Sequence, residues 1–316
     1  QTFDLSPATA GKYVIVVTDP LPPYPYGVVH ESNEDNNTGV GQTNVTTVPS
    51  DLRVVSVSAP AENYSGEKTT VTWTVQNVGG PVWDGTRYWV DAVWLSPDPT
   101  FIPGRATLLG TYAHSNATPL GANESYTQMA EVTLPRGIGG KDIAGKYFLY
   151  VVTDANPYYP SNPNGELDRG SNTDAHDRHY AGSAYEGIGG ELNNQGKGNM
   201  PVFYREPDLK ITTLTVAPEG LAGQFITASF TVSNIGTRDT REKIWSDRIF
   251  LSRDPSLDTG DLQLAEALHS GILNKDASYT GTFTFKLPED ISGDFYLLAF
   301  TDSEADVRLA YNYSNI

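Results

Sequence analysis

The chain has 316 residues, of which 38% are hydrophobic and none is cysteine, so it can bury large cores but cannot form a disulfide. Its formal net charge of −17 argues against nucleic acid and against anionic membrane surfaces as partners, because both need clustered Lys and Arg. The sequence contains no long uninterrupted apolar run and therefore predicts no membrane insertion.

The first 50 residues have the pattern of the last strands of a module. A β-branched run over 11–19 ends in a turn signal, a loop rich in Pro and Tyr follows, and a final strand begins after Asn36-Asn37. The stretch from Glu34 to Leu52 returns 157 residues later as Glu191 to Leu209. We therefore interpret residues 1–50 as the C-terminal strands of a partial module, and this repeated stretch as a junction between modules.

Residues 51–207 are predicted to form a complete module. Its alternating or β-branched runs predict strands at 51–57, 70–77, 88–96, 126–134 and 146–154. A long loop insertion at about 155–190 separates the last of these from the final strand.

Residues 208–316 repeat the same order, at offsets of 157 and then 156 over their first strands. Phe230 stands where Trp73 stands, and Trp245 and Asp247 stand where Trp89 and Asp91 stand. The sequence stops at the point where the Asn-Asn pair of the repeat begins, so this third module is predicted to lack its final strand.

Short alternating strands, frequent turn signals and the lack of helical periodicity predict an all-β fold of tandem β-sandwich modules. The inward face is predicted to carry Val71, Trp73 and Val75, with Tyr88, Val90, Phe148 and Tyr150 as further candidates. Trp73 and Phe230 are expected to fill the middle of each core, because large aromatic residues in such strands are usually buried.

Several recurring pieces of sequence resemble a known family. They include an Asp-Leu strand start, Leu-Ser-x-Asp-Pro, Gly-x-Tyr, Thr-Asp and Glu-x-Asn-Asn, and they are most specific over 251–261 and 31–37. This pattern resembles the CARDB module, the cell-adhesion-related domain found in bacteria and archaea, over nearly the whole chain outside 155–190. The resemblance implies tandem Ig-like sandwiches in secreted or cell-surface proteins, and it implies no catalytic activity.

One acidic loop is a candidate metal site. Asp254, Asp258 and Asp261 lie within eight residues around a Gly turn, and carboxylate oxygens are the ligands that Ca²⁺ prefers. The alternative is a hairpin in which Asp and Gly only satisfy the geometry of the turn. In the preceding module the equivalent loop keeps only Asp98, so no site is expected there.

The insertion at 155–190 is a second candidate. Its Asp and His residues, among them His176 and His179, could bind a transition metal, and its Tyr residues could contact another subunit or a glycan. The alternative is a solvent-exposed polar loop. Six Asn-x-Ser/Thr sequons, at Asn36, Asn44, Asn63, Asn116, Asn123 and Asn312, could carry glycans.

None of the common catalytic or nucleotide-binding motifs is present in the sequence, so we do not expect an enzyme. The first hypothesis is an extracellular structural or adhesive repeat array, whose partners are copies of itself or neighbouring modules of a longer chain. The most specific version of this hypothesis is a surface filament in which subunits are joined by strand exchange. The alternative is a module that binds an extracellular glycan or protein through the 155–190 loop.

Overall fold

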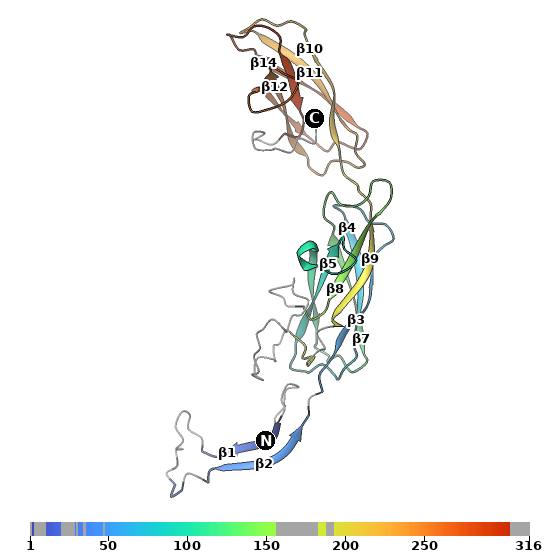
Figure 1. The fold of residues 1–316 in the computed structure, drawn as a ribbon, viewed down its shortest axis with the longest axis vertical. Coiled ribbons are helices and arrows are strands. Elements are labelled where there is room, and N and C mark those ends of the chain that lie inside the picture. Colours follow the sequence, from blue (N-terminus) through green and yellow to red (C-terminus); the bar gives the residue numbers. More distant parts are fainter. Residues whose placement is uncertain are drawn as a thin grey trace. The chain divides into compact units, whose positions relative to one another are not determined.

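The computed structural model describes residues 2, 11–19, 29, 31–33, 36–46, 48–155, 183–187 and 193–303. Within these ranges the chain is built from β-strands and one short 3-10 helix, and no described helix has the length and hydrophobicity that crossing a bilayer requires. The expected all-β class is therefore confirmed (Figure 1).

The described strands are β1 Gly11–Val17, β2 Thr38–Val45, β3 Leu52–Ser58, β4 Lys68–Asn77, β5 Tyr88–Ser96, β6 Thr107–Ser115, β7 Ser125–Thr133, β8 Gly145–Val152, β9 Gln195–Val202, β10 Leu209–Val216, β11 Phe225–Asn234, β12 Ile244–Ser252, β13 Leu262–Ser270, β14 Ser278–Lys286 and β15 Tyr296–Phe300. The 3-10 helix, η1, spans Pro103–Arg105 between β5 and β6.

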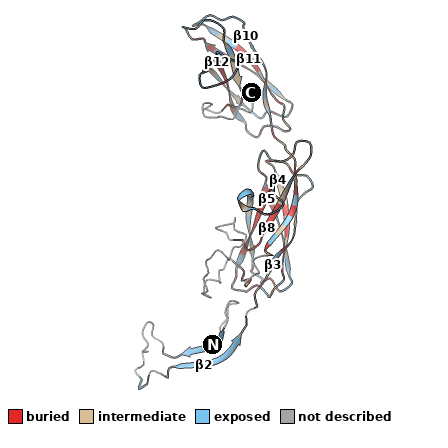
Figure 2. Cartoon of the chain, in the orientation of Figure 1, coloured by how far each residue is buried: buried red, intermediate tan, exposed pale blue. Residues whose placement is uncertain are grey.

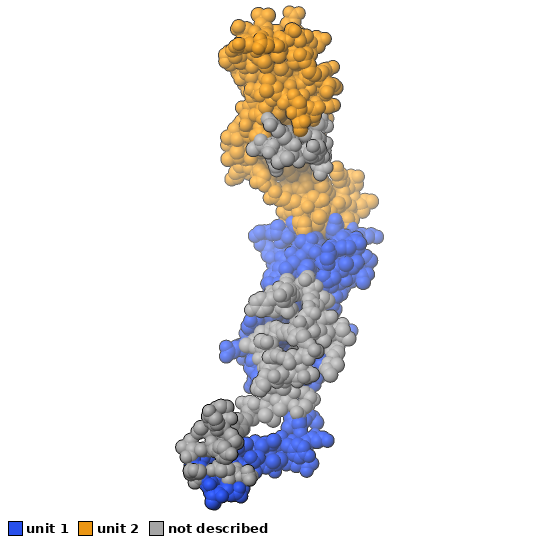
Figure 3. Space-filling view, turned by 60° about the vertical axis from the view of Figure 1, so that its left-hand side comes forward, with its two compact units in different colours: residues 1–63, 68–134, 146–201 blue, residues 64–67, 135–145, 202–316 orange. Residues whose placement is uncertain are grey.

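The chain divides into two compact units (Figure 3). Unit 1 comprises residues 1–63, 68–134 and 146–201, and unit 2 comprises residues 64–67, 135–145 and 202–316. Unit 1 holds a three-stranded sheet β3-β4-β7, a four-stranded sheet β6-β5-β8-β9 and the separate hairpin β1-β2. Unit 2 holds the sheets β10-β11-β14 and β13-β12-β15.

The core of unit 1 lies between its two larger sheets. Val71, Trp73 and Val75 alternate along β4 and are completely buried, as the period of the sequence predicts. The Trp73 ring packs against Tyr112 of β6, in the opposite sheet, with 5.4 Å between ring centroids. Contacts of this kind across the two sheets make unit 1 a β-sandwich.

Unit 2 is organised in the same way. One buried cluster combines Phe230 of β11 and Phe283 of β14 with Trp245 and Ile249 of β12, so both sheets contribute to a single core. The Phe230 and Phe283 rings are stacked with 4.3 Å between centroids. The prediction that Trp73 and Phe230 fill the two cores is confirmed, since both are at most 1% exposed.

Two details differ from the sequence-based expectation. Tyr88 was predicted to point inward, but it is 42% exposed because it opens β5 at the end of the sandwich. The strands β6 and β13 had not been assigned from the sequence. Both are edge strands with only intermediate or exposed residues, so they lack the strict alternation that marks the central strands.

Candidate functional site

The hairpin β1-β2 carries an unusual amount of exposed apolar surface. Every residue of β1 is exposed, and Tyr13, Ile15 and Val16 are each more than 60% accessible (Figure 2). β1 pairs with β2, and the described residues offer it no second sheet to pack against. A strand of β-branched and aromatic residues normally lies in a core, so this surface is a candidate binding site.

Local geometry shows that β1-β2 is another copy of the β8-β9 hairpin. The N–H of Thr18 donates to the carbonyl oxygen of Asn37 at 2.9 Å, and that of Thr153 donates to the carbonyl oxygen of Asn194 at 3.0 Å. The following residue, Asp19 or Asp154, adopts a left-handed φ of 47° or 49°. In β8 the corresponding apolar residues are buried, so the exposure of β1 reflects missing neighbours and not a different strand.

Unit 2 has the complementary feature, a sheet edge with which no described strand pairs. β8 lies between β5 and β9, but its counterpart β15 pairs with β12 and with no other strand of the described residues. Asp302, two residues after this strand, has the same left-handed φ, at 52°, which places β15 in register with β1 and β8. The outer edge of β15 is therefore the position that β9 occupies in unit 1.

A buried polar cluster links the two sheets of unit 1. The Asp91 carboxylate on β5 accepts hydrogen bonds from Trp73 Nε1 at 2.7 Å, from Thr153 Oγ1 at 2.7 Å and from the Tyr126 hydroxyl at 2.9 and 3.0 Å. Burial raises the pKa of Asp91 to about 6, although these three hydrogen bonds oppose the shift. Trp89 Nε1 in turn donates to the Tyr126 hydroxyl at 2.8 Å.

Unit 2 repeats this cluster with one change. The Tyr279 hydroxyl donates to Asp247 at 2.6 Å and accepts a hydrogen bond from Trp245 Nε1 at 3.0 Å. Phe230 replaces Trp73 and offers no N–H, and the pKa of Asp247 is also raised by burial. In both units a His ring, His114 or His269, stacks on this Trp and Tyr pair. The aspartates are solvent-inaccessible and held by the cores, which favours a structural role.

The burial of these aspartates was not predicted, although the sequence contains a signal for it. An acidic residue stands at the same position of an otherwise apolar strand in both repeats, as Trp-x-Asp. A charge in that position must be buried with partners, because a carboxylate in a core needs compensating hydrogen bonds.

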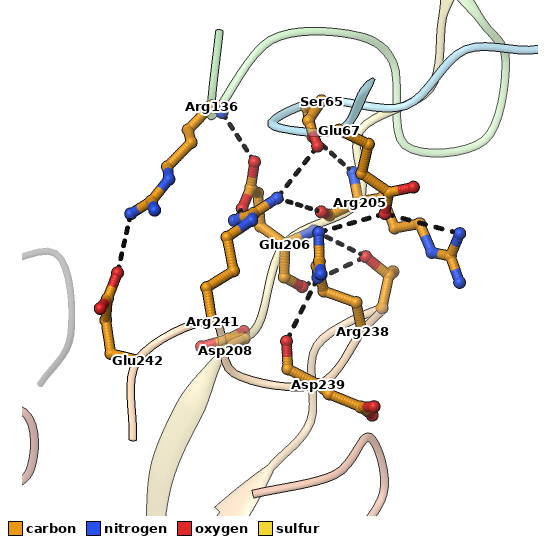
Figure 4. Close-up of polar contacts among 12 residues, drawn as sticks. Ser65, Glu67, Arg136, Arg205, Glu206, Asp208, Arg238, Asp239, Arg241 and Glu242 are labelled. Atoms are coloured by element: carbon orange, nitrogen blue, oxygen red, sulfur yellow. Dashed lines mark hydrogen bonds and ion pairs between the residues drawn. The ribbon is translucent and has the colours of Figure 1, made fainter. Parts of the chain in front are cut away.

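A group of ion pairs lies in unit 2 (Figure 4). The Arg241 guanidinium contacts the Glu206 carboxylate, and both side chains are about nine-tenths buried. Arg241 also donates to the carbonyl oxygens of Ser65 at 3.0 Å and Arg205 at 3.3 Å. Burial acts to raise the pKa of Glu206, but the hydrogen bonds from Arg241 and from the Gly137 N–H outweigh it and hold that pKa below its usual value.

Weaker pairs surround this contact. Arg238 and Arg205 reach Glu67 at 3.1 and 3.6 Å, and Arg136 reaches Glu242 at 3.1 Å with both side chains largely exposed. A cavity of about 280 Å³ lies beside Arg241 and is also lined by Trp245 and Thr301. Its charged groups are engaged with one another, so the arrangement fastens the segments 64–67 and 135–137 to the start of β10 and shows no catalytic geometry.

The predicted calcium loop uses its carboxylates locally. Asp254 Oδ1 accepts the Ser256 N–H at 2.8 Å, Asp258 Oδ1 accepts the Gly260 N–H at 2.6 Å, and Asp261 Oδ2 accepts the Asp258 N–H at 2.7 Å. Among the described residues, no three His, Cys, Asp or Glu side chains gather as a metal-binding group. These hydrogen bonds have the pattern of the turn alternative, and Ca²⁺ at this loop stays a prediction.

Some of the other sites predicted from the sequence lie outside the described residues. His176 and His179, with most of the 155–190 insertion, lie outside the described residues, as does the sequon at Asn312. Two further sequons are inaccessible in the folded chain, because Asn63 and Asn116 are 2% and 3% exposed and their side-chain amides donate to backbone carbonyls. A glycan on either residue is incompatible with this fold.

Comparison with known proteins gives a fold-level result. No model of a known protein family matches the chain, and no curated protein matches it in sequence. Among solved structures it matches the crystal structure of a CARDB domain from Pyrococcus furiosus, determined in complex with di-metal ions. The two share 16% identity, the match covers 51% of this chain and 99% of that domain, and the TM-score is 0.28.

Over half of its length the chain is similar in structure to a CARDB domain. Red sea bream transglutaminase matches over 80% of this chain and 29% of its own at 11% identity, with a TM-score of 0.25. A β-glucosidase from Listeria innocua matches over 51% and 17% at 13% identity, with a TM-score of 0.24. At these identities and scores the matches carry no argument about activity or ligands.

Proposed function

We propose that the chain is an extracellular structural array of bacteria or archaea, in which the hairpin β1-β2 of one copy completes the sheet of unit 2 in another copy. The observation that carries the proposal is the match between the exposed hairpin and the free edge of β15. The hairpin is the element that unit 1 has in β8-β9, and the edge is where that element's second strand would pair. A second copy therefore offers the complementary part.

Physical reasons favour such pairing. A lone two-stranded hairpin is only marginally stable in water, and an open edge with unpaired backbone groups attracts further strands. Adding β2 to β15 would use those backbone groups and cover part of the apolar surface of both partners. Because the donor and acceptor surfaces are different, each added copy leaves one of each free, and the contact builds an open chain of subunits.

The register follows from the repeated Thr-Asp turn. Aligning Asp19 with Asp302 places Ile15 at the position of Leu298. Ile15 pairs with Val40 inside the hairpin. Both pairings use the same edge of β2, so β2 would have to leave β1; if it then takes the position of β9, Val40 of the donor would lie opposite Leu298 of the acceptor. Residues paired across a ladder have Cα atoms about 4.5–5.5 Å apart, within disulfide range.

The register can be tested by cross-linking, since the chain has no natural cysteine. Equimolar Val40→Cys and Leu298→Cys proteins, each with a different tag, are mixed and oxidised, and the heterodimer is measured. Val55→Cys replaces Leu298→Cys in the control, because Val55 is 48% exposed on β3 in unit 1. We expect a heterodimer only in the first mixture.

The second arm compares the assembly of the full chain with that of residues 51–316. Loss of oligomers on removal of residues 1–50 is the expected result. Unchanged oligomers, or equal cross-linking in both mixtures, would contradict strand exchange. Monomers of the full chain at high concentration would instead indicate completion by neighbouring modules of a longer protein.

A further inference from the structure

A buried polar corner of unit 1 lies where β8 ends and β9 begins. Asp154 and Glu186 are both 3% exposed, and Asn194 is 1% exposed. The Asp154 carboxylate accepts the Ala184 N–H at 3.0 Å and the Ser183 hydroxyl at 2.9 Å, which holds the segment 183–187 against the end of β8. Two carboxylates are thus buried in one small region, independent of the strand-exchange surfaces.

Two buried oxygen atoms in this corner accept no hydrogen bond from a described residue. The Glu186 carboxylate accepts hydrogen bonds from the Leu52 N–H and, at 3.3 Å, from Asn194 Nδ2, while its buried Oε2 accepts none from a described residue. Asn193 turns its Nδ2 toward Asp51 Oδ1 at 3.0 Å and leaves its own Oδ1 buried without a hydrogen bond. Asp154 and Asp51 both lie close enough to Glu186 to act on its charge, so three carboxylates share this corner.

The chemistry of these groups indicates which class of ligand they could bind. A buried carboxylate is stable only if it is neutralised by a proton, a cationic side chain or a metal ion. Among the described residues, no Lys or Arg acts on Glu186. Carboxylate and amide oxygens are hard ligands, and Ca²⁺ accepts Asp, Glu and Asn oxygens in irregular geometry, with water completing its shell.

The same set of residues recurs in the first repeat. The Val29 N–H donates to Asp19 at 2.7 Å, as the Ala184 N–H does to Asp154. Two residues beyond each donor is a glutamate, Glu31 or Glu186, and each Asn-Asn pair precedes the final strand. Glu31 is exposed on the isolated hairpin, so the buried form of the set is found only in unit 1 among the described residues.

We infer that Asp154, Glu186 and Asn193 bind a divalent cation, Ca²⁺, in unit 1. The ion would lie between the end of β8, the segment 183–187 and the start of β9, and it would neutralise the two carboxylates. It would therefore fasten both ends of the 155–190 insertion to the sandwich. This site differs from the Asp254 loop, whose carboxylates accept backbone N–H groups.

The test is calcium titration of the metal-free full chain by calorimetry, with Ca²⁺ as the only added ligand. We expect binding to the wild type, and a loss of affinity of at least about tenfold in Glu186→Gln, because a removed ligand should cost no less than a removed supporting residue. Asp258→Ala is the matched control and should keep the wild-type affinity at this site, whether or not the loop of Asp258 takes a second ion. Asn193→Asp adds a charge to the site and should bind Ca²⁺ more tightly, a gain that misfolding cannot produce.

Three results would overturn the inference. The first is no heat of binding at millimolar Ca²⁺. The second is equal affinity of wild type, Glu186→Gln and Asn193→Asp. The third is binding that disappears in Asp258→Ala, which would assign the ion to the other loop. A wild type that ignores Ca²⁺ but is stabilised as the pH falls would show that a proton, not a metal ion, neutralises Glu186.

Discussion

Replacing Asp91 with Asn tests whether ionisation of this buried carboxyl destabilises unit 1. Asp91 is fully buried and accepts its hydrogen bonds from Trp73, Tyr126 and Thr153, with no cation among the partners that act on it. Asn has nearly the same shape and retains an acceptor oxygen, but it cannot ionise. The variant therefore removes the titration while keeping most of the packing.

The size of the effect follows from the shift in pKa. The folded pKa of Asp91 is about 6, against 3.8 for a free carboxyl. Because the folded pKa is raised, the stabilisation by this group is complete below pH 3.8 and is lost as the pH rises through 6. A difference of about two units corresponds to about 3 kcal/mol at 1.36 kcal/mol per unit. For a chain of this size this is a shift in melting temperature of roughly 6–12 °C.

The assay is thermal or urea unfolding from pH 4 to 8, followed by tryptophan fluorescence. Four of the five tryptophans, Trp73, Trp83, Trp89 and Trp94, lie in unit 1, so the signal reports mainly on that unit. Other titrating groups such as Glu186 are common to both proteins, and the difference between wild type and Asp91→Asn isolates Asp91. We expect the wild type to lose stability relative to the variant between pH 4 and 7. Parallel profiles across that range would refute the reasoning.

Two further predictions concern unit 2. Arg241→Met leaves the nearly buried Glu206 carboxylate without its cation and should destabilise unit 2 by about 3 kcal/mol in urea unfolding. Arg136→Met, which breaks the exposed pair with Glu242, should change stability by less than about 1 kcal/mol, and equal effects of the two would contradict this ranking. If Asp254, Asp258 and Asp261 bind Ca²⁺, a chelator should lower the melting temperature of unit 2, Asp258→Ala should abolish that response and Asp98→Ala should not. The same melting temperature with chelator and with millimolar Ca²⁺ would reject a stabilising ion at this loop.

The central strands could be predicted from the sequence because burial on one face imposes a period of two. Val71, Trp73 and Val75 show that period clearly, and the fixed offset between repeats carries the same assignment to Phe230. The edge strands β6 and β13 could not be predicted in this way, since half-exposed strands accept small and polar residues without regular alternation.

The polar sites were harder to predict, because sequence shows which acidic residues are close along the chain but not which ones lose water. The closely spaced residues Asp254, Asp258 and Asp261 were predicted as a metal site. Their carboxylate oxygens instead accept hydrogen bonds from backbone N–H groups of the turn. Glu186 is isolated in sequence, and only the packing of 183–187 against β8 buries it beside Asp154. Burial of this kind depends on contacts between residues 29 and 30 positions apart.

The buried Asp–Tyr pairs have a consequence for where such modules can work. Asp91 on β5 is joined to Trp73 on β4 and Tyr126 on β7, and Asp247 on β12 is joined to Tyr279 on β14, so each pair bridges the two sheets of its sandwich. In many secreted sandwiches a disulfide makes that bridge and fails when it is reduced. Here the bridge consists of hydrogen bonds in a dry core and the chain has no thiol. The link between the two sheets of each module therefore does not depend on the redox state of the surroundings.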